Sequence, residues 1–313
     1  MELIYKLSDL IGIRIECRFG DDEKKIYRFF KYHLWSDEFY VKRNFYKSHG
    51  YKLDLNNPQT LCEKIQWLKL HDRRDFNTLC ADKYLAPQYI GEKFGQDCIV
   101  PILFSTDNCK DICFENMPDI PFIIKSNHAS GQYYIVKDKR DVKDWRKIQL
   151  MCRKWLDVNY YWFDKEWQYK NIQRRIIVEK LLLTSKGEIP NDYKLHCING
   201  KVQFIYVAAQ RQKLGCKHRL MYSPKWEPLM FAWDGKNVNV AELRGEEIEF
   251  PQSLSRMIEI AEGVAQNFRY VRVDFYDVDG KPYFGEITLH DGGGNDVIEP
   301  EEWDLKWGKM LKL

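Results

Sequence analysis

The sequence predicts an α+β protein in which antiparallel sheets follow a mostly helical N-terminal region. The first 75 or so residues carry helical patterns, whereas beyond about Ile99 short apolar runs alternate with helical stretches. Asn199-Gly200 and Asp279-Gly280 each separate two strand-like runs, which predicts two β-hairpins. The alternation lacks the regular βαβ period of a doubly wound parallel sheet.

Composition excludes several classes of protein. The 313 residues carry 49 Lys plus Arg against 46 Asp plus Glu, so a nucleic-acid binder with a broad basic face is not expected. The nine cysteines form no CxxC pair and no zinc-finger spacing. No secretory signal is recognisable at the start, and no apolar run approaches the roughly 20 residues of a membrane span. We therefore expect a cytoplasmic protein that can still associate peripherally with a membrane.

The elements are predicted in order from local patterns. Thr60-Leu61-Cys62-Glu63 is a capping box, which predicts a helix through Trp67 and Leu70. Apolar runs then predict strands at 99–103, 121–125 and 175–182, and periodic charged or aromatic stretches predict helices at 138–155 and 164–169. In the second half we expect strands at 193–198, 202–209, 271–278 and 282–289 and a helix over 251–267.

The last hairpin carries the most informative polar residues. Strand alternation places Arg272 and Asp274 on one face of the first strand, and Phe284, Glu286 and Thr288 on one face of the second. Which faces coincide depends on the length of the turn, because a shift of one residue flips every side chain.

A three-residue connection at 279–281 would bring Asp274 opposite Glu286, whereas a strict two-residue turn would separate them. Two facing carboxylates repel unless a cation lies between them, and magnesium takes such oxygens together with substrate phosphates. Arg272 would then neutralise a transferring phosphoryl group. The alternative is an ordinary sheet face with an Arg272 salt bridge and a solvated glutamate.

A second candidate begins at Lys125, where a strand enters a loop of small and polar residues that includes Ser130 and Gly131. Small residues let backbone N–H groups approach phosphate oxygens, and the lysine adds a point charge. The loop is not a Walker A motif, and an ordinary turn is the alternative. His128 would be either a phosphate contact or a cap of the loop.

Glu179 is a carboxylate inside an apolar strand. A nucleotide hinge would use backbone groups of Lys180 and Leu182 for the adenine edge, with this carboxylate nearby. The alternative is an ion pair between Glu179 and Arg174 or Arg175.

Lys194 and Arg211 are placed to reach a triphosphate or to remain surface charges. The aromatic stretch 155–167 is either a stacking lid for a sugar or helix-packing core, and Gly292–Gly294 predicts a tightly turned loop after the carboxylate strand.

From about Asn57 to its C-terminus, the chain resembles the ATP-grasp superfamily. It is most similar to the TupA-like family, named for teichuronopeptide biosynthesis and found in bacterial surface-polysaccharide gene clusters. The likeness lies in the order of seven segments: 57–68, 81–84, 125–131, 177–179, 192–194, 271–276 and 283–288.

This resemblance implies an ATP-grasp fold, in which two α+β subdomains with antiparallel sheets grip ATP. The expected division is an N-terminal, mostly helical region at 1–108, a first subdomain at 109–184 and a second at 185–313. The implied nucleotide contacts are Lys83, Lys125, Ser130, Gly131, Glu179, Lys180 and Leu182.

The resemblance also implies roles at the reaction centre. Lys194 and Arg211 would face the γ-phosphate or acyl group, and Arg272 would stabilise the intermediate. The magnesium ligands would be Asp274, Glu286 and Thr288. Many ATP-grasp ligases have an asparagine at the position of Thr288, and a hydroxyl is a weaker metal ligand than an amide carbonyl.

The implied activity is that of an ADP-forming ligase with ATP and Mg2+ as cofactors. Such enzymes phosphorylate a carboxylate to an acyl phosphate, which an amine attacks to form an amide. For this family the acid would be a hexuronic acid, and the amine an amino acid or small amino compound, in capsule or O-antigen polysaccharide biosynthesis. The alternatives are a sugar phosphotransferase, a non-catalytic nucleotide-binding protein or a glycosyltransferase. The glycosyltransferase would use Asp277-Val278-Asp279 as a DxD motif, although a turn explains that triplet better.

Overall fold

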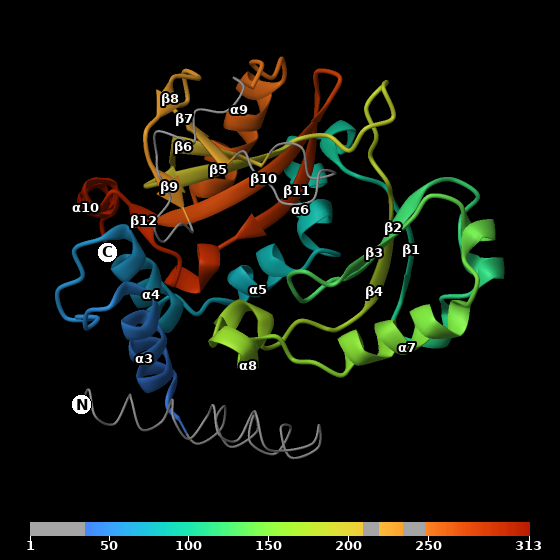
Figure 1. The fold of residues 1–313 in the computed structure, drawn as a ribbon, viewed down its shortest axis with the longest axis horizontal. Coiled ribbons are helices and arrows are strands. Elements are labelled where there is room, and N and C mark those ends of the chain that lie inside the picture. Colours follow the sequence, from blue (N-terminus) through green and yellow to red (C-terminus); the bar gives the residue numbers. More distant parts are fainter. Residues whose placement is uncertain (1–34, 209–218, 234–247) are drawn as a thin grey trace.

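The computed structural model describes residues 35–208, 219–233 and 248–313. These residues form two larger antiparallel sheets and one two-stranded sheet, flanked by helices (Figure 1). The α-helices are α3 (Asp37–His49), α4 (Leu61–His71), α5 (Asp75–Ala81), α6 (Ala86–Phe94), α7 (Trp145–Leu156), α8 (Tyr161–Asp164), α9 (Leu254–Ala265) and α10 (Glu301–Met310). Short 3-10 turns are η1 (Gln96–Cys98), η2 (Cys109–Asp111), η3 (Phe114–Asn116), η4 (Lys139–Asp141), η5 (Trp167–Tyr169) and η7 (Asp291–Gly294). Helical structure predicted before residue 35 lies outside the described residues.

The larger sheet has six strands in the order β11-β10-β5-β6-β7-β8. Its strands are β5 (Asp192–Ile198), β6 (Lys201–Ala208), β7 (Arg219–Tyr222), β8 (Pro228–Leu229), β10 (Tyr270–Val278) and β11 (Lys281–Thr288). One face packs against α9, because alternate residues such as Leu195, Val207 and Val273 point into the core that Met257 and Ile260 complete. The other face is therefore left for polar side chains at one end.

Both predicted hairpins are present, and both have two-residue turns. Asn199 and Gly200 have φ values of 50° and 79°, and Asp279 and Gly280 have values of 52° and 84°. These left-handed conformations suit an Asx-Gly pair. The turn at 279–280 is therefore the two-residue alternative, and the three-residue connection on which facing carboxylates would depend is not formed.

A β-bulge at Gly285 nevertheless brings the two carboxylates together. Phe275 pairs with Phe284 and Asp274 with Glu286, so Gly285 is the extra residue. The bulge reverses the face of the strand between Phe284 and Glu286. Phe284 consequently packs in the core with Phe275, and the prediction that it shares a face with Glu286 is wrong.

The smaller sheet has four strands in the order β1-β4-β2-β3. They are β1 (Ile102–Thr106), β2 (Phe122–Ser126), β3 (Tyr133–Val136) and β4 (Ile176–Lys180). Helix α7 covers the face that carries Phe122, Ile124 and Val178. The division at 108 and 184 stays a proposal, and β1, which precedes residue 108, pairs with β4 in this sheet.

The helices of the N-terminal half connect the sheets. Helix α4 begins with the predicted capping box, in which Thr60 and Glu63 each accept a hydrogen bond from the other's backbone. It packs against α10 and η7, whereas α6 packs against β11. The remaining two-stranded sheet pairs β9 (Ala232–Trp233) with β12 (Ile298–Glu299). None of the helices in the described residues is long and apolar enough to cross a membrane.

Two predicted helices begin or end elsewhere. The helix predicted at 138–155 starts only at Trp145, because Asp144 accepts a hydrogen bond from the Arg146 N–H and caps it. The helix predicted at 164–169 is instead two single turns, α8 and η5. They are separated by Lys165, whose φ of 60° is incompatible with a continuous right-handed helix.

Candidate active site

A row of charged residues crosses the polar face of the larger sheet. Asp274 on β10 lies between Lys194 on β5 and Glu286 on β11, because the strand registers pair both with it. Lys194 Nζ lies 2.6 Å from Asp274 Oδ2 and 2.9 Å from Asp192 Oδ2. The row thus places one lysine beside two carboxylates on three neighbouring strands.

Arg272 ties the carboxylates of this row together. Its Nε and Nη2 donate to the two Asp274 oxygens at 2.7 and 2.8 Å, and Nη2 also donates to Glu286 Oε1 at 3.1 Å. Its Nη1 donates to Asp291, in the loop after β11. Arg272 is 8% exposed and Asp274 is 3% exposed, so these charge-assisted hydrogen bonds are largely shielded from water.

The cations determine the ionisation of Glu286. Burial disfavours its charged form, but Lys83, Arg272 and Lys194 outweigh burial and hold the pKa of Glu286 well below its usual range. Burial and Arg272 similarly oppose the charge on Lys194, yet Asp192 and Asp274 raise the pKa of that lysine. The site thus favours the ionised forms of Glu286 and Lys194, whereas burial raises the pKa of Asp274 against the opposing effects of Arg272 and Lys194.

These residues fit a magnesium ion that is bound together with a nucleotide. Magnesium usually takes one or two protein carboxylates plus phosphate oxygens and water, and Asp274 and Glu286 form such a pair. Thr288 lies two residues beyond Glu286, opposite Arg272 in the register. In the described part of the chain no group of three or more His, Cys, Asp or Glu is arranged to hold a metal. Phosphate oxygens would therefore complete the coordination.

The segment between α5 and α6 joins this row to the smaller sheet. Lys83 Nζ lies 3.0 Å from Glu286 Oε2, and the Lys83 N–H donates to the Asn127 carbonyl at 2.9 Å. Asn127, just after β2, also donates to Asp82 at 2.8 Å and accepts from the Arg175 N–H at 2.8 Å. Figure 1 shows the turn between β2 and β3 approaching α5.

The smaller sheet presents Lys125 and Glu179 on the face opposite α7. Lys125 Nζ lies 2.5 Å from Glu179 Oε2, because the two residues are diagonal neighbours on β2 and β4. The alternative partner Arg175 instead stacks over the ring of Tyr84 at 4.4 Å. Phosphate oxygens would compete with Glu179 for the Lys125 ammonium.

The loop after Lys125 has a buried base and an exposed tip. Ala129 is buried, whereas Ser130 and Gly131 are exposed, and Gly131 has a φ of 73° in open space. His128 is 1% exposed and contacts the Trp155 carbonyl and the Asn127 side chain at 3.1 Å. Burial lowers the pKa of His128 to about 4, so this residue is the neutral loop cap.

The end of β4 leaves a backbone acceptor of the kind an adenine amino group needs. The Lys180 N–H donates to the Pro101 carbonyl at 3.0 Å, so it is not free for a nucleotide. Two residues joined by such a hydrogen bond in an antiparallel ladder normally form a second one in the reverse direction. Pro101 has no N–H and cannot donate this second hydrogen bond to the Lys180 carbonyl. The Lys180 carbonyl therefore lacks its ladder partner.

Other residues lie outside this cluster. Arg211 is outside the described residues. Asp277 and Asp279 belong to the turn region: Asp277 accepts from Ser253, and Asp279 accepts from Ser185. The DxD triplet is therefore structural, as the turn interpretation predicted.

The sequence did not indicate Asp291 or Asn127. Asp291 follows the carboxylate strand directly and precedes three glycines, and that position was its one sequence signal.

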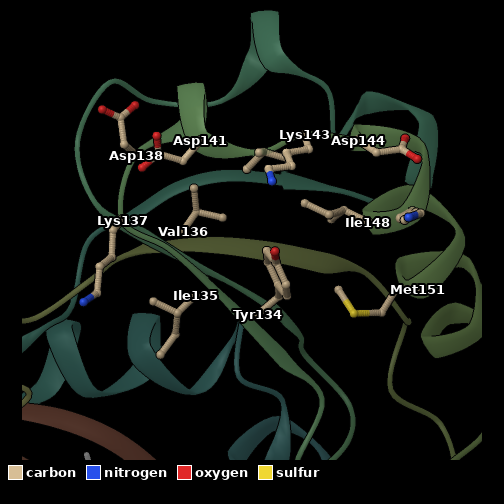
Figure 2. Close-up of a pocket in the computed structure, with 12 residues that line it drawn as sticks. Tyr134, Ile135, Val136, Lys137, Asp138, Asp141, Lys143, Asp144, Ile148 and Met151 are labelled. Carbon is tan, nitrogen blue, oxygen red and sulfur yellow. The ribbon is translucent and has the colours of Figure 1, made fainter.

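A pocket of about 510 Å³ lies elsewhere, between β3 and α7. Figure 2 shows Tyr134, Ile148 and Met151 converging on it, whereas Lys137 and Asp138 extend away. Tyr134 lies on the α7 face of the sheet, opposite Lys125 and Glu179, so this pocket is separate from the charged row.

A lysine-bearing antiparallel sheet beside a second sheet that carries a carboxylate pair and an arginine is the arrangement of the ATP-grasp fold. Proteins of this class bind ATP with Mg2+. The chain belongs to the TupA-like ATP-grasp family, whose model matches residues 63–312. No functionally curated protein matches the chain in sequence.

Solved structures show weaker similarity. D-alanine–D-alanine ligase from Bacillus anthracis, complexed with ATP, is 16% identical over 67% of this chain and 54% of its own, with a TM-score of 0.37. The Helicobacter pylori enzyme is 15% identical over 74% and 59%, with a TM-score of 0.40. Phosphoribosylamine–glycine ligase from Thermotoga maritima is 11% identical over 72% and 54%, with a TM-score of 0.39. The chain thus spans less than two thirds of each of these ligases.

Proposed function

We propose that this protein is an ATP-dependent carboxylate–amine ligase that forms an amide through an acyl phosphate. The observation that carries the proposal is the cluster of Arg272, Asp274, Glu286, Lys194 and Lys83, in which a carboxylate pair is surrounded by three cations. Membership of the TupA-like ATP-grasp family supports the same chemistry. From the family we further propose that the acid is a hexuronic acid of a capsule or O-antigen polysaccharide, and the amine an amino acid or small amino compound.

In the first step, the phosphorylation of the carboxylate by ATP, different residues would have different roles. Asp274 and Glu286, with Thr288 nearby, would hold magnesium, which neutralises phosphate charge when bound. Lys83 and Lys125 would bind the phosphates from the two sheets, and Ser130 and Gly131 would close over them.

Glu179, the Lys180 carbonyl and the Leu182 backbone would hold adenine and ribose. Lys194, Arg211 and Arg272 would face the transferring phosphoryl group and stabilise the charge that develops on it.

A hydroxylamine trap tests the proposal without knowledge of the amine. The protein is incubated with Mg-ATP, hydroxylamine and a panel of uronic acids and their sugar nucleotides, and the products are read by mass spectrometry. We expect a hydroxamate together with ADP, which would also name the acid. Bound ATP without hydroxamate for any of these acids would contradict the proposed small-molecule acid, and no ATP binding would contradict the ATP-dependent reaction itself.

Asp274→Asn gives the matching variant. We expect it to fold like the wild type and to lower hydroxamate formation at least a thousand-fold, because one carboxylate of the proposed metal pair is lost. The control is Asp107→Asn, an exposed aspartate beyond β1. An active Asp274→Asn enzyme would refute the metal assignment.

A further inference from the structure

A buried acidic cluster follows α8, beside the charged row. Glu166 is 7% exposed and the Asp164 side chain is 16% exposed. Lys69 Nζ lies 3.5 Å from Asp164 Oδ2 and donates to the Gly293 carbonyl at 2.6 Å. Within the described residues Glu166 forms no ion pair with a lysine or arginine. The cluster therefore holds one carboxylate without a cationic partner.

Asp164 and Lys69 already explain how the glycine loop is held. A Cβ on Gly293 would lie 1.7 Å from Asp164 Oδ2, so the loop packs directly on this carboxylate. Asn295 also donates to Asp164 at 3.2 Å. Glu166 takes no part in these contacts, and support of the loop does not account for it.

Two buried polar atoms near Glu166 have no hydrogen-bond partner among the described residues. Gln168 Nε2 donates to Glu166 Oε1 at 2.9 Å, which leaves Gln168 Oε1 buried. In the described part of the chain neither Gln168 Oε1 nor His290 Nδ1 has a hydrogen-bond partner. His290 Nδ1 lies 3.6 Å from Glu166 Oε1, too far for a direct hydrogen bond. A neutral imidazole ring has one nitrogen that can accept a hydrogen bond.

This set of atoms selects a class of ligand. A carboxylate, an amide oxygen and a neutral imidazole nitrogen all accept hydrogen bonds, and the carboxylate is unpaired. A primary ammonium group supplies three donors and one positive charge, and it has no acceptor of its own.

The cluster adjoins the proposed reaction centre. His290 precedes Asp291, which pairs with Arg272, and Arg272 contacts both Asp274 and Glu286. An amine held beside Glu166 would lie next to a carboxylate activated at the charged row.

Resting on the proposed ligase function, we propose that Glu166, Gln168 and His290 form the subsite for the amine substrate, which binds as a primary ammonium and loses a proton to Glu166. The nitrogen lone pair then forms the C–N bond to the carbonyl carbon of the acyl phosphate. The C–O bond to phosphate breaks, and its electron pair leaves with the phosphate. The second proton of the attacking nitrogen leaves with the phosphate.

The surroundings of Glu166 suit this role. Burial, helped by Asp291, raises its pKa to about 7 against the opposing effects of Lys69, Gln168 and Lys83. A base whose pKa lies near the working pH transfers protons in both directions effectively.

The test compares two nucleophiles in one reaction. Hydroxylamine is uncharged at pH 7.5 and needs no base, whereas methylamine, ethanolamine and glycine carry an ammonium group. Wild type, Glu166→Gln and the exposed control Glu115→Gln are incubated with Mg-ATP, the acid found by the trap, hydroxylamine and these three amines. The ratio of amide to hydroxamate is measured by mass spectrometry.

We expect Glu166→Gln to lower this ratio at least ten-fold and Glu115→Gln to leave it unchanged. Gln168→Met, which removes the unpaired oxygen, should raise the amine KM without an equal loss of kcat. Equal losses of amide and hydroxamate in Glu166→Gln would overturn the subsite. The subsite would also be overturned if the wild-type enzyme made hydroxamate but the amines neither formed amides nor lowered the yield of hydroxamate. A wild type that makes no hydroxamate would instead contradict the proposed function.

Discussion

Arg272 shows how one side chain organises the charged row. Its planar guanidinium carries five donors in a fixed geometry, and here they serve Asp274, Glu286 and Asp291. A lysine at this position would supply the charge but not the fork, because its ammonium is a point charge on a flexible stem. The arrangement holds both proposed metal ligands in place before a nucleotide binds.

Glu166 gives a prediction about stability at the residue scale. Its pKa is raised to about 7 in the folded protein, so the folded state holds this proton more strongly than the unfolded state does. The free energy of unfolding therefore falls as pH rises from about 4.5 to about 7. Above that range, the full loss of stability caused by the charged Glu166 carboxylate is present. Lys69, Lys83 and Asp291 are charged groups that act on this carboxylate.

Glu166→Gln removes this pH-dependent loss of stability, because glutamine does not ionise. We expect the variant to match wild type near pH 4.5 and to be more stable at pH 8 by on the order of 2 kcal/mol. Urea unfolding at the two pH values measures the difference. A variant less stable than wild type at pH 8 would show that the charged carboxylate is already paired.

At the scale of elements, the β10–β11 hairpin combines a turn with a bulge. The two-residue turn alone would place Asp274 and Glu286 on opposite faces of the sheet, and the extra residue Gly285 restores them to one face. The same shift lets Phe284 pack under α9. The hairpin can therefore contribute to both the core and the site.

Gly280 tests the turn. Its φ of 84° is a left-handed conformation, and an added Cβ would lie 2.9 Å from Gln252 Oε1. We expect Gly280→Ala to lower the free energy of unfolding by about 1–2 kcal/mol, since a Cβ is strained in this conformation. Gly280→Asn should lose less, because asparagine adopts left-handed conformations more readily. Urea unfolding of both variants gives the comparison, and equal losses would argue against backbone strain as the cause.

At the scale of the whole molecule, the two sheets meet through a short segment. Lys83 reaches Glu286 in the larger sheet while its backbone N–H binds Asn127 beside the smaller one. Phosphates bound between Lys83 and Lys125 would add a second connection. Binding of Mg-ATP should therefore stabilise the molecule as a unit.

We expect Mg-ATP at 100 times its Kd to raise the free energy of unfolding by about 2.7 kcal/mol. Lys125→Met should lose most of this gain at the same nucleotide concentration, whereas Lys147→Met, on the exposed side of α7, should keep it. Thermal unfolding compares each variant with and without nucleotide. The loss of stability that Lys125→Met causes by leaving Glu179 unpaired is present in both measurements and therefore cancels. Full retention of the gain in Lys125→Met would remove that lysine from the phosphate site.

The sequence by itself determined several of the local elements and the protein family. The capping box at Thr60 and both Asx-Gly hairpins follow from interactions between near neighbours, which do not depend on the rest of the fold. The ordered segments from 57 to 288 likewise predicted the ATP-grasp fold and the TupA-like family, and both predictions are confirmed.

Only the tertiary structure decided which polar residues meet. The bulge at Gly285 depends on packing Phe284 into the core, and the contacts of Arg272 with Asp291 and of Lys83 with Asn127 join residues far apart in the chain. The pairing of Lys125 with Glu179 across two strands is of the same kind. Such contacts arise from the register of strands and the approach of the two sheets, and neither is encoded in a local pattern.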